Sequence, residues 1–193
     1  GHALARVYGA ALPTLLAEAI RPLPELQRVK LYIAEEQYIL RKAYESLFPL
    51  EPGIEVVGVS GKITGEALVG AAQDLAPDVM LLGFNVLQQD TVEQLRMIRE
   101  SCPDVSMVVL CAHYDVKGIR AIRDFSRDSQ TACAFLLKHT VDTVGQLAQV
   151  INSVAEGRVV LDPAVMEGLI AGEESEASLL KELAPAEMEV LGW

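Results

Sequence analysis

Cysteine and long apolar runs are both scarce in this chain. Only three cysteines occur in 193 residues, and no two of them have the Cys-x-x-Cys spacing of redox or zinc sites. A disulfide scaffold is therefore excluded, and a reducing cytoplasm is the expected location. No apolar stretch approaches the roughly 20 residues that a helix needs to cross a bilayer, so we expect no association with a membrane.

Positive charge is also in short supply. The chain has 16 basic and 27 acidic residues, a formal net charge of −11, which repels phosphate backbones. We therefore do not expect this chain to hold nucleic acid by itself. Hydrophobic residues make up 51% of the sequence, which is enough for a folded core and excludes the disordered class.

Strand and helix patterns alternate regularly over residues 29–158. Five short apolar runs predict strands at Val29–Ile33, Ile54–Val59, Val79–Leu82, Ser106–Leu110 and Ala134–Leu137. A stretch with apolar residues at helical spacing follows each run. Unbroken apolar runs indicate strands that are buried on both faces, as in a parallel sheet. The sequence therefore predicts a doubly wound α/β fold with a five-stranded parallel sheet.

Residues 1–28 precede this region as an N-terminal helical extension. Pro13 interrupts the helical pattern, which predicts a broken helix or two short helices. One face of the pattern is apolar and consists of Leu12, Leu15, Leu16 and Ile20. An amphipathic helix of this kind packs on its own domain or on a dimer mate, and we predict that it contributes to self-association.

Residues 159–182 and 183–193 follow the α/β region. The first range contains a short predicted helix, Pro163–Ile170, and an acidic linker with small residues, Gly172–Ser178. In the second range, helical spacing resumes and is still in progress at Trp193. We therefore expect the chain to be a fragment of a longer protein.

Charged residues follow the first and fifth predicted strands. Ligands of parallel α/β sheets bind at the carboxyl ends of the strands, where Glu35, Glu36 and Lys138 are expected. Two carboxylates are a weak Mg²⁺ candidate, with a solvated acidic loop as the alternative, and an ammonium group suits a phosphoryl oxygen. A phosphoryl-receiving site also needs a carboxylate nucleophile after the third strand, where the chain has Gly83.

These residues resemble a known family. Residues 29–158 resemble the receiver domain of response regulators, in particular its NarL/FixJ branch, through the acidic pair, the lead-in Ala76–Leu82 and Lys138. Leu183–Leu191 resembles the opening of a LuxR-type helix-turn-helix. The resemblance implies a flavodoxin-like fold, two-component signal transduction and a transcription regulator whose DNA-binding domain is truncated at Trp193.

The departures from the family pattern gather at one site. The phosphoacceptor aspartate falls on Gly83, the switch serine or threonine on Cys111 and the switch aromatic on Phe135. Both members of the acidic pair are glutamate, one methylene longer than the usual aspartate. The resemblance thus implies a pseudo-receiver, which keeps the fold and has lost the phosphorylation reaction. Its degenerate acceptor pocket consists of Glu35, Glu36, Gly83, Cys111 and Lys138.

The expected function is that of a regulatory module and not of an enzyme. We expect no cofactor and no resident metal. Signalling would depend on a homodimer, a protein partner or a small ligand, and DNA would be contacted only through the missing C-terminal domain.

Two other functions remain open. The first is a conventional phosphorylated receiver with a displaced acceptor, for which Asp78, Asp90 and Asp115 are the available aspartates. The second is a redox or ligand sensor that uses Cys111, although most buried thiols are inert. A nucleotide-binding enzyme is disfavoured, because no glycine-rich fingerprint follows the first strand.

Overall fold

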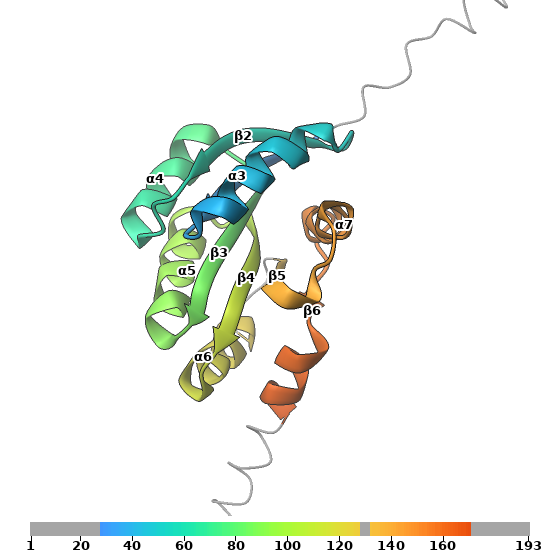
Figure 1. Cartoon of the computed structure of the whole chain (residues 1–193). Coiled ribbons are helices and arrows are strands. Elements are labelled where there is room, and N and C mark those ends of the chain that lie inside the picture. The colour runs from blue at the N-terminus through green and yellow to red at the C-terminus, as the bar shows by residue number, and fades with distance from the viewer. Residues whose placement is uncertain (1–27, 128–131, 171–193) are drawn as a thin grey trace, which may run out of the picture.

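The computed structural model describes residues 28–127 and 132–170. These residues form one parallel sheet in the order β2-β1-β3-β4-β5-β6, with helices on both faces (Figure 1). The strands are β1 (Val29–Glu35), β2 (Ile54–Ser60), β3 (Val79–Leu87), β4 (Ser106–Tyr114), β5 (Cys133–Leu137) and β6 (Val160–Leu161). The helices are α3 (Tyr38–Leu47), α4 (Gly65–Leu75), α5 (Gln89–Ser101), α6 (Val116–Arg127) and α7 (Val144–Ala155), with short 3₁₀ turns η1 (Phe48–Leu50) and η2 (Lys138–Thr140).

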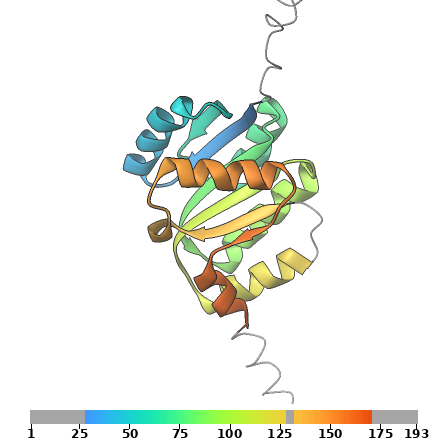
Figure 2. The same cartoon turned by 90° about the vertical axis from the view of Figure 1, so that its right-hand side faces the viewer.

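The helices divide into two layers. Helices α4, α5 and α6 pack on one face of the sheet, where the larger cluster of buried apolar residues lies. Helices α3 and α7 cover the other face, with a second cluster beneath them (Figure 2). The predicted doubly wound α/β fold is confirmed. Its physical basis is the strand composition, because the first six residues of β3 are buried on both faces of the sheet.

The sheet has six strands where the sequence predicts five. Helix α7 is followed by Gly157 at φ 88°, a left-handed conformation that glycine adopts without steric cost. The chain then turns back, and Val160 pairs with Ala134 as the outer strand β6. The sequence shows only three apolar residues at this point, Val159–Leu161, which is too short a run to predict a strand.

Strands β3 and β4 continue beyond their predicted ends. The sequence pattern ends them at Leu82 and Leu110, yet the ladder continues through Phe84, which pairs with Cys111, to Leu87. Tertiary pairing extends both strands through residues that have little apolar periodicity. Positions 83 and 111 therefore lie inside the sheet, and not in loops after it.

The predicted helix after β6 is present at residues 163–170. Asp162 precedes it and accepts a hydrogen bond from the backbone N–H of Ala164 at 2.9 Å, as a helix-capping residue does. The Tyr114 hydroxyl donates to the Ala164 carbonyl oxygen at 3.1 Å, and Val165 is fully buried. These contacts fasten the helix to the carboxyl end of β4.

Several sequence predictions lie outside the described residues. They concern the N-terminal extension up to residue 27, the linker Gly172–Ser178 and the helix-turn-helix start at residues 183–193. Across residues 28–127 and 132–170, no helix combines the length and the apolar character that crossing a membrane requires.

Candidate functional site

The predicted acceptor pocket lies at the carboxyl ends of the central strands. Glu35 is the last residue of β1 and is the register partner of Gly83 in β3. On the next strand, Cys111 of β4 is the register partner of Leu137, and Lys138 follows directly after β5. The fold thus brings Glu35, Gly83, Cys111 and Lys138 to one edge of the sheet, as predicted for ligand sites of parallel sheets.

Glu35 and Lys138 form a buried ion pair. The Lys138 Nζ atom donates to Glu35 Oε1 at 2.7 Å, and the two side chains are only 9% and 1% exposed. The backbone N–H of Gln37 donates to the same carboxylate oxygen at 2.8 Å. Charge-assisted hydrogen bonds in a site that excludes water fix both partners in place. The lysine is therefore already neutralised by a side chain of this chain.

The Glu35 carboxylate fills the space beside Gly83. A Cβ atom placed on Gly83 would lie 1.8 Å from Glu35 Oε2 and 2.5 Å from its carboxyl carbon. Two non-bonded heavy atoms cannot approach so closely, so Glu35 holds this position only because residue 83 has no side chain. The glutamate at 35 and the glycine at 83 are thus one structural feature, although they look like two separate departures in the sequence.

The second carboxylate oxygen of Glu35 has an unusual environment. Glu35 Oε2 is buried and has no hydrogen-bond partner among the described residues. An unpartnered buried carboxylate oxygen costs free energy, because it has lost water and gained no donor. The bonds that Oε1 makes to Lys138 and Gln37 must offset this cost.

Glu36, the second acid of the pair, points elsewhere. Its Oε2 atom accepts from the backbone N–H of Asn85 at 2.9 Å, and its own N–H donates to the Gly83 carbonyl at 3.1 Å. Glu36 is exposed, whereas Glu35 is buried. The two acids therefore present no common set of open oxygens, and within the described ranges no three potential ligand side chains cluster around a metal position. This arrangement does not fit the oxygen cage that Mg²⁺ prefers.

Arg41 is a further residue of the site, and the sequence reasoning missed it. Its Nη1 atom donates to the carbonyl oxygen of Glu35 at 2.7 Å, and the guanidinium lies over the Tyr38 ring, 5.3 Å from the ring centroid. Arg41 thereby holds the end of β1 against α3. A basic residue on a predicted surface helix carries no sequence signal for such a contact.

Cys111 is a buried thiol. It is 2% exposed, and its Sγ lies 3.8 Å from the Leu136 carbonyl oxygen as a weak hydrogen bond. Burial raises the pKa of the thiol to about 11, although the positive charge of Lys138 lowers it in part. His113, two residues further along β4, is exposed. Cys111 and His113 therefore do not converge on a common ligand.

Phe135, which the family resemblance predicts as the switch aromatic, lies in β5. It is 1% exposed and packs edge-on against Phe125 of α6, with the ring centroids 6.1 Å apart. On the outer side, the Arg99 guanidinium lies 3.3 Å from the centroid of the Phe125 ring and donates to the Phe125 carbonyl. Phe135 is thus part of the packed core between β5 and α6.

The three aspartates considered as displaced acceptors lie apart from the ion pair. Asp78 precedes β3 at the opposite end of the sheet, where it accepts from the Lys30 N–H at 2.8 Å. Asp90 is in the first turn of α5. Asp115 accepts from the N–H of Gly118 at the start of α6. None of these contacts involves Lys138.

Comparison with known proteins gives a consistent group of relatives. No family model matches the chain. The response regulator VraR of Staphylococcus epidermidis is 25% identical over 163 residues, which cover 84% of this chain and 74% of VraR. VraR of Staphylococcus aureus is 24% identical over the same length.

Solved structures give the same result for the fold. The receiver domain of RcsB from Salmonella enterica serovar Typhimurium, with a phosphomimetic, superposes with a TM-score of 0.57 at 18% identity, covering 74% of this chain and 99% of that domain. A LuxR-family response regulator from Aurantimonas gives 0.56 at 16% identity, covering 76% and 98%. The chain therefore has the receiver fold, and the curated relatives it resembles in sequence are response regulators.

Proposed function

We propose that the chain is the regulatory module of a transcription regulator and that it works without phosphorylation of its receiver domain. The observation that carries this proposal is the position of the Glu35 carboxylate. It occupies the space beside Gly83 and pairs with Lys138. The residue that would attack phosphorus is missing, and an internal anion stands in its place.

The ion pair gives this pocket a permanent electrostatic state. In a phosphoryl-receiving site, a lysine neutralises charge that arrives with the phosphoryl group. Here Lys138 contacts a carboxylate that is part of the folded chain, at 2.7 Å. A donor anion would have to displace Glu35 from a buried, hydrogen-bonded position, which is costly because the carboxylate would lose its cation and its hydrogen bonds.

The module then signals through contacts with other molecules. The RcsB relative has been solved as two dimers bound to two parallel DNAs. By analogy, we propose a homodimer whose DNA contacts are made by a further domain and not by residues 29–158. Exposed apolar side chains on α3 support an additional contact surface, since Ile39 is 80% and Tyr38 64% exposed. A cytoplasmic location is supported by the three cysteines, all of which are free.

The two alternative functions have less support. A displaced acceptor would need a carboxylate near Lys138, and Asp78, Asp90 and Asp115 make their contacts elsewhere. A thiol sensor would need an accessible thiolate at Cys111, and burial keeps that thiol protonated at neutral pH.

Beryllofluoride with Mg²⁺ tests the proposal, because it mimics a phosphoryl group on an acceptor aspartate. We expect the sedimentation coefficient of the chain to be the same with and without the mimic. The matched control is the double variant Glu35→Asp/Gly83→Asp. It places an acceptor aspartate at residue 83, and the shorter side chain at residue 35 leaves room for that aspartate. A shift to a larger species in the unaltered chain would refute a phosphorylation-independent module.

A further inference from the structure

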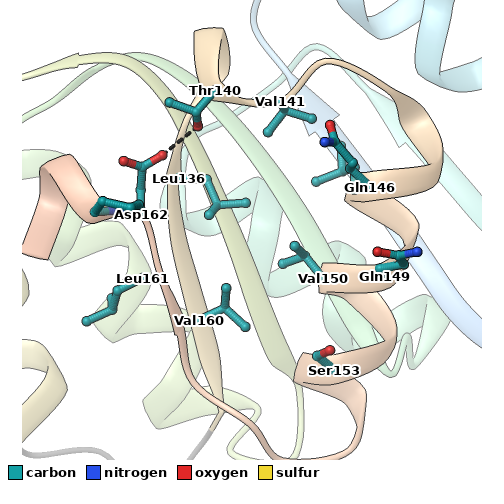
Figure 3. A pocket seen from close by; sticks show the side chains of 12 residues that line it. Leu136, Thr140, Val141, Gln146, Gln149, Val150, Ser153, Val160, Leu161 and Asp162 are labelled. Atoms are coloured by element: carbon teal, nitrogen blue, oxygen red, sulfur yellow. Dashed lines mark hydrogen bonds between the residues drawn. The ribbon is translucent and has the colours of Figure 1, made fainter.

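A groove lies along α7 at the outer edge of the sheet. It has a volume of about 450 Å³, and Figure 3 shows its lining side chains between α7, β5 and β6. Its apolar lining on the α7 side of the sheet includes Leu136, Leu147, Val150 and Val160, whereas Leu161, the next residue of β6, packs on the opposite face. Its rim consists of the uncharged polar residues Gln146, Gln149 and Ser153. A groove with this lining suits an apolar partner better than a charged ligand.

The charged side chain that lines the groove, Asp162, is fully hydrogen-bonded within the chain. Asp162 is 4% exposed, accepts from the Thr140 hydroxyl at 2.5 Å, and also caps the helix at residues 163–170. Both of its carboxylate oxygens therefore have partners within the chain. An occupant therefore finds no free charge in the groove, only apolar contact area and the uncharged polar side chains of the rim.

We propose that the occupant is the N-terminal extension of the same chain, through the apolar face of residues 12–20. This face consists of Leu12, Leu15, Leu16 and Ile20, for which the sequence pattern allows its own domain or a dimer mate and predicts self-association. The proposal replaces that prediction. The position of Arg28 favours the chain's own domain. Arg28 lines a second cavity together with Asn152 and Ala155, so the extension joins the fold beside the carboxyl end of α7.

The lengths agree with this path. The groove follows α7 from Gln146 to Ser153, seven residues, or roughly 10 Å of helix. The apolar face from Leu12 to Ile20 covers eight residues. It begins at the Pro13 break, and because proline suits the first turn of a helix, a helix that starts there would span roughly 12 Å. The seven residues 21–27 between the face and Arg28 reach at most about 23 Å, more than the roughly 10 Å diameter of the helix that they must pass.

The tether also favours docking within one chain. A segment joined to its groove by a short linker is present at an effective concentration in the millimolar range, which a second copy does not reach in dilute solution. The linker contains Pro22 and Pro24, which restrict its conformations. Because the extension enters at the Ser153 end, Ile20 should lie near Ser153 and Leu12 near Gln146, so that the helix runs parallel to α7.

Cysteine cross-linking in the full chain tests both the occupant and its direction. In a Cys102→Ser background, we would pair Ile20→Cys with Ser153→Cys, and Leu12→Cys with Gln146→Cys, under mild oxidation. We expect a disulfide within one chain for both pairs, seen as a monomer on a non-reducing gel. The exchanged pair, Leu12→Cys with Ser153→Cys, should cross-link much more slowly.

Ile39→Cys with Ser153→Cys serves as the matched control, because Ile39 is exposed on α3 and does not line the groove. Cross-links that join two chains would replace the proposal by a groove for a second copy. Equal cross-linking of the matched, exchanged and control pairs, or no cross-linking in any pair, would overturn the proposal.

Hydrogen exchange of the α7 amides provides a second test without engineered cysteines. Leu16→Asp should increase the exchange rate of α7 relative to the unaltered chain, and an unchanged rate would also overturn the proposal.

Discussion

Glu35 Oε2 lies 1.8 Å from the point where a Cβ atom of residue 83 would be, and glycine at 83 is what makes this approach possible. The two residues are neighbours in register on β1 and β3. The carboxylate that results is buried and paired with Lys138, in the pocket that the family resemblance predicts as the degenerate acceptor site. Five predictions follow from this relationship and from the groups around it.

The first concerns Gly83→Ala. The new Cβ must push the Glu35 carboxylate out of its ion pair, so we expect a loss of about 1–3 kcal/mol in the free energy of unfolding, measured with urea. Gly70→Ala is the matched control, because a Cβ there meets nothing within 4 Å and the residue lies inside α4. That variant should gain up to about 1 kcal/mol from helix propensity. If Gly83→Ala and Gly70→Ala change the free energy of unfolding equally, then the Cβ of residue 83 does not displace Glu35.

A double-mutant cycle isolates the contact between the two residues. In a Glu35→Ala background the space beside residue 83 is open, so Gly83→Ala should cost much less there. A cost that is the same in both backgrounds would show that Glu35 is not what the Cβ meets.

The second prediction concerns the ion pair. Lys138→Met leaves the Glu35 carboxylate buried without its cation, and we expect a loss of about 3–5 kcal/mol, measured by denaturation at pH 7. Adding Glu35→Gln removes the orphaned charge and should recover most of that loss. If the single variant is as stable as the unaltered chain, the pair is not buried in solution.

The third prediction concerns the thiol of Cys111. With a pKa of about 11, only about one thiol in a thousand is ionised at pH 8. Iodoacetamide should therefore label the half-buried Cys102 well before Cys111, as measured by mass spectrometry of the folded chain. Rapid labelling of Cys111 at neutral pH would instead favour a redox-sensor function.

The fourth prediction concerns alkaline stability. Burial, together with the negative charge of Glu35, raises the pKa of Tyr44 to about 12, above its ordinary value of 10. Between these values the unfolded chain loses the phenolic proton and the folded chain keeps it, so stability should fall as pH rises from 10 to 12. Tyr44→Phe should reduce this fall and leave the pH dependence near neutrality unchanged. An identical alkaline profile in both proteins would show that the partly buried Tyr44 hydroxyl is not shielded from water beside Glu35.

The sequence predicts the fold well because the fold depends on periodic apolar patterns. The buried run in β3 and the apolar residues at helical spacing in α7 are local signals, and both elements form as expected. The lengths of β3 and β4 depend on pairing between distant segments. Their extension to Leu87 and Tyr114, and the addition of β6, therefore came only from the structure.

The candidate site shows the same limit. The residue types at Glu35, Gly83 and Lys138 indicate a pocket without an acceptor, and the family resemblance places them at one edge of the sheet. From the sequence alone, Glu35 is a candidate Mg²⁺ ligand or part of a solvated acidic loop. The extra methylene of Glu35 carries the carboxylate into the space left by Gly83. This contact joins residues on two different strands, so neither position reveals it in the sequence.

The fifth prediction tests the central claim most directly, by intact-mass measurement after incubation with acetyl phosphate and Mg²⁺. The unaltered chain should show no phosphoryl adduct, because no carboxylate nucleophile stands at residue 83 and Glu35 is engaged with Lys138. Glu35→Asp/Gly83→Asp, treated in parallel, should acquire an acid-labile adduct if the rest of the pocket is sound. A stoichiometric, acid-labile adduct on the unaltered chain would contradict the account.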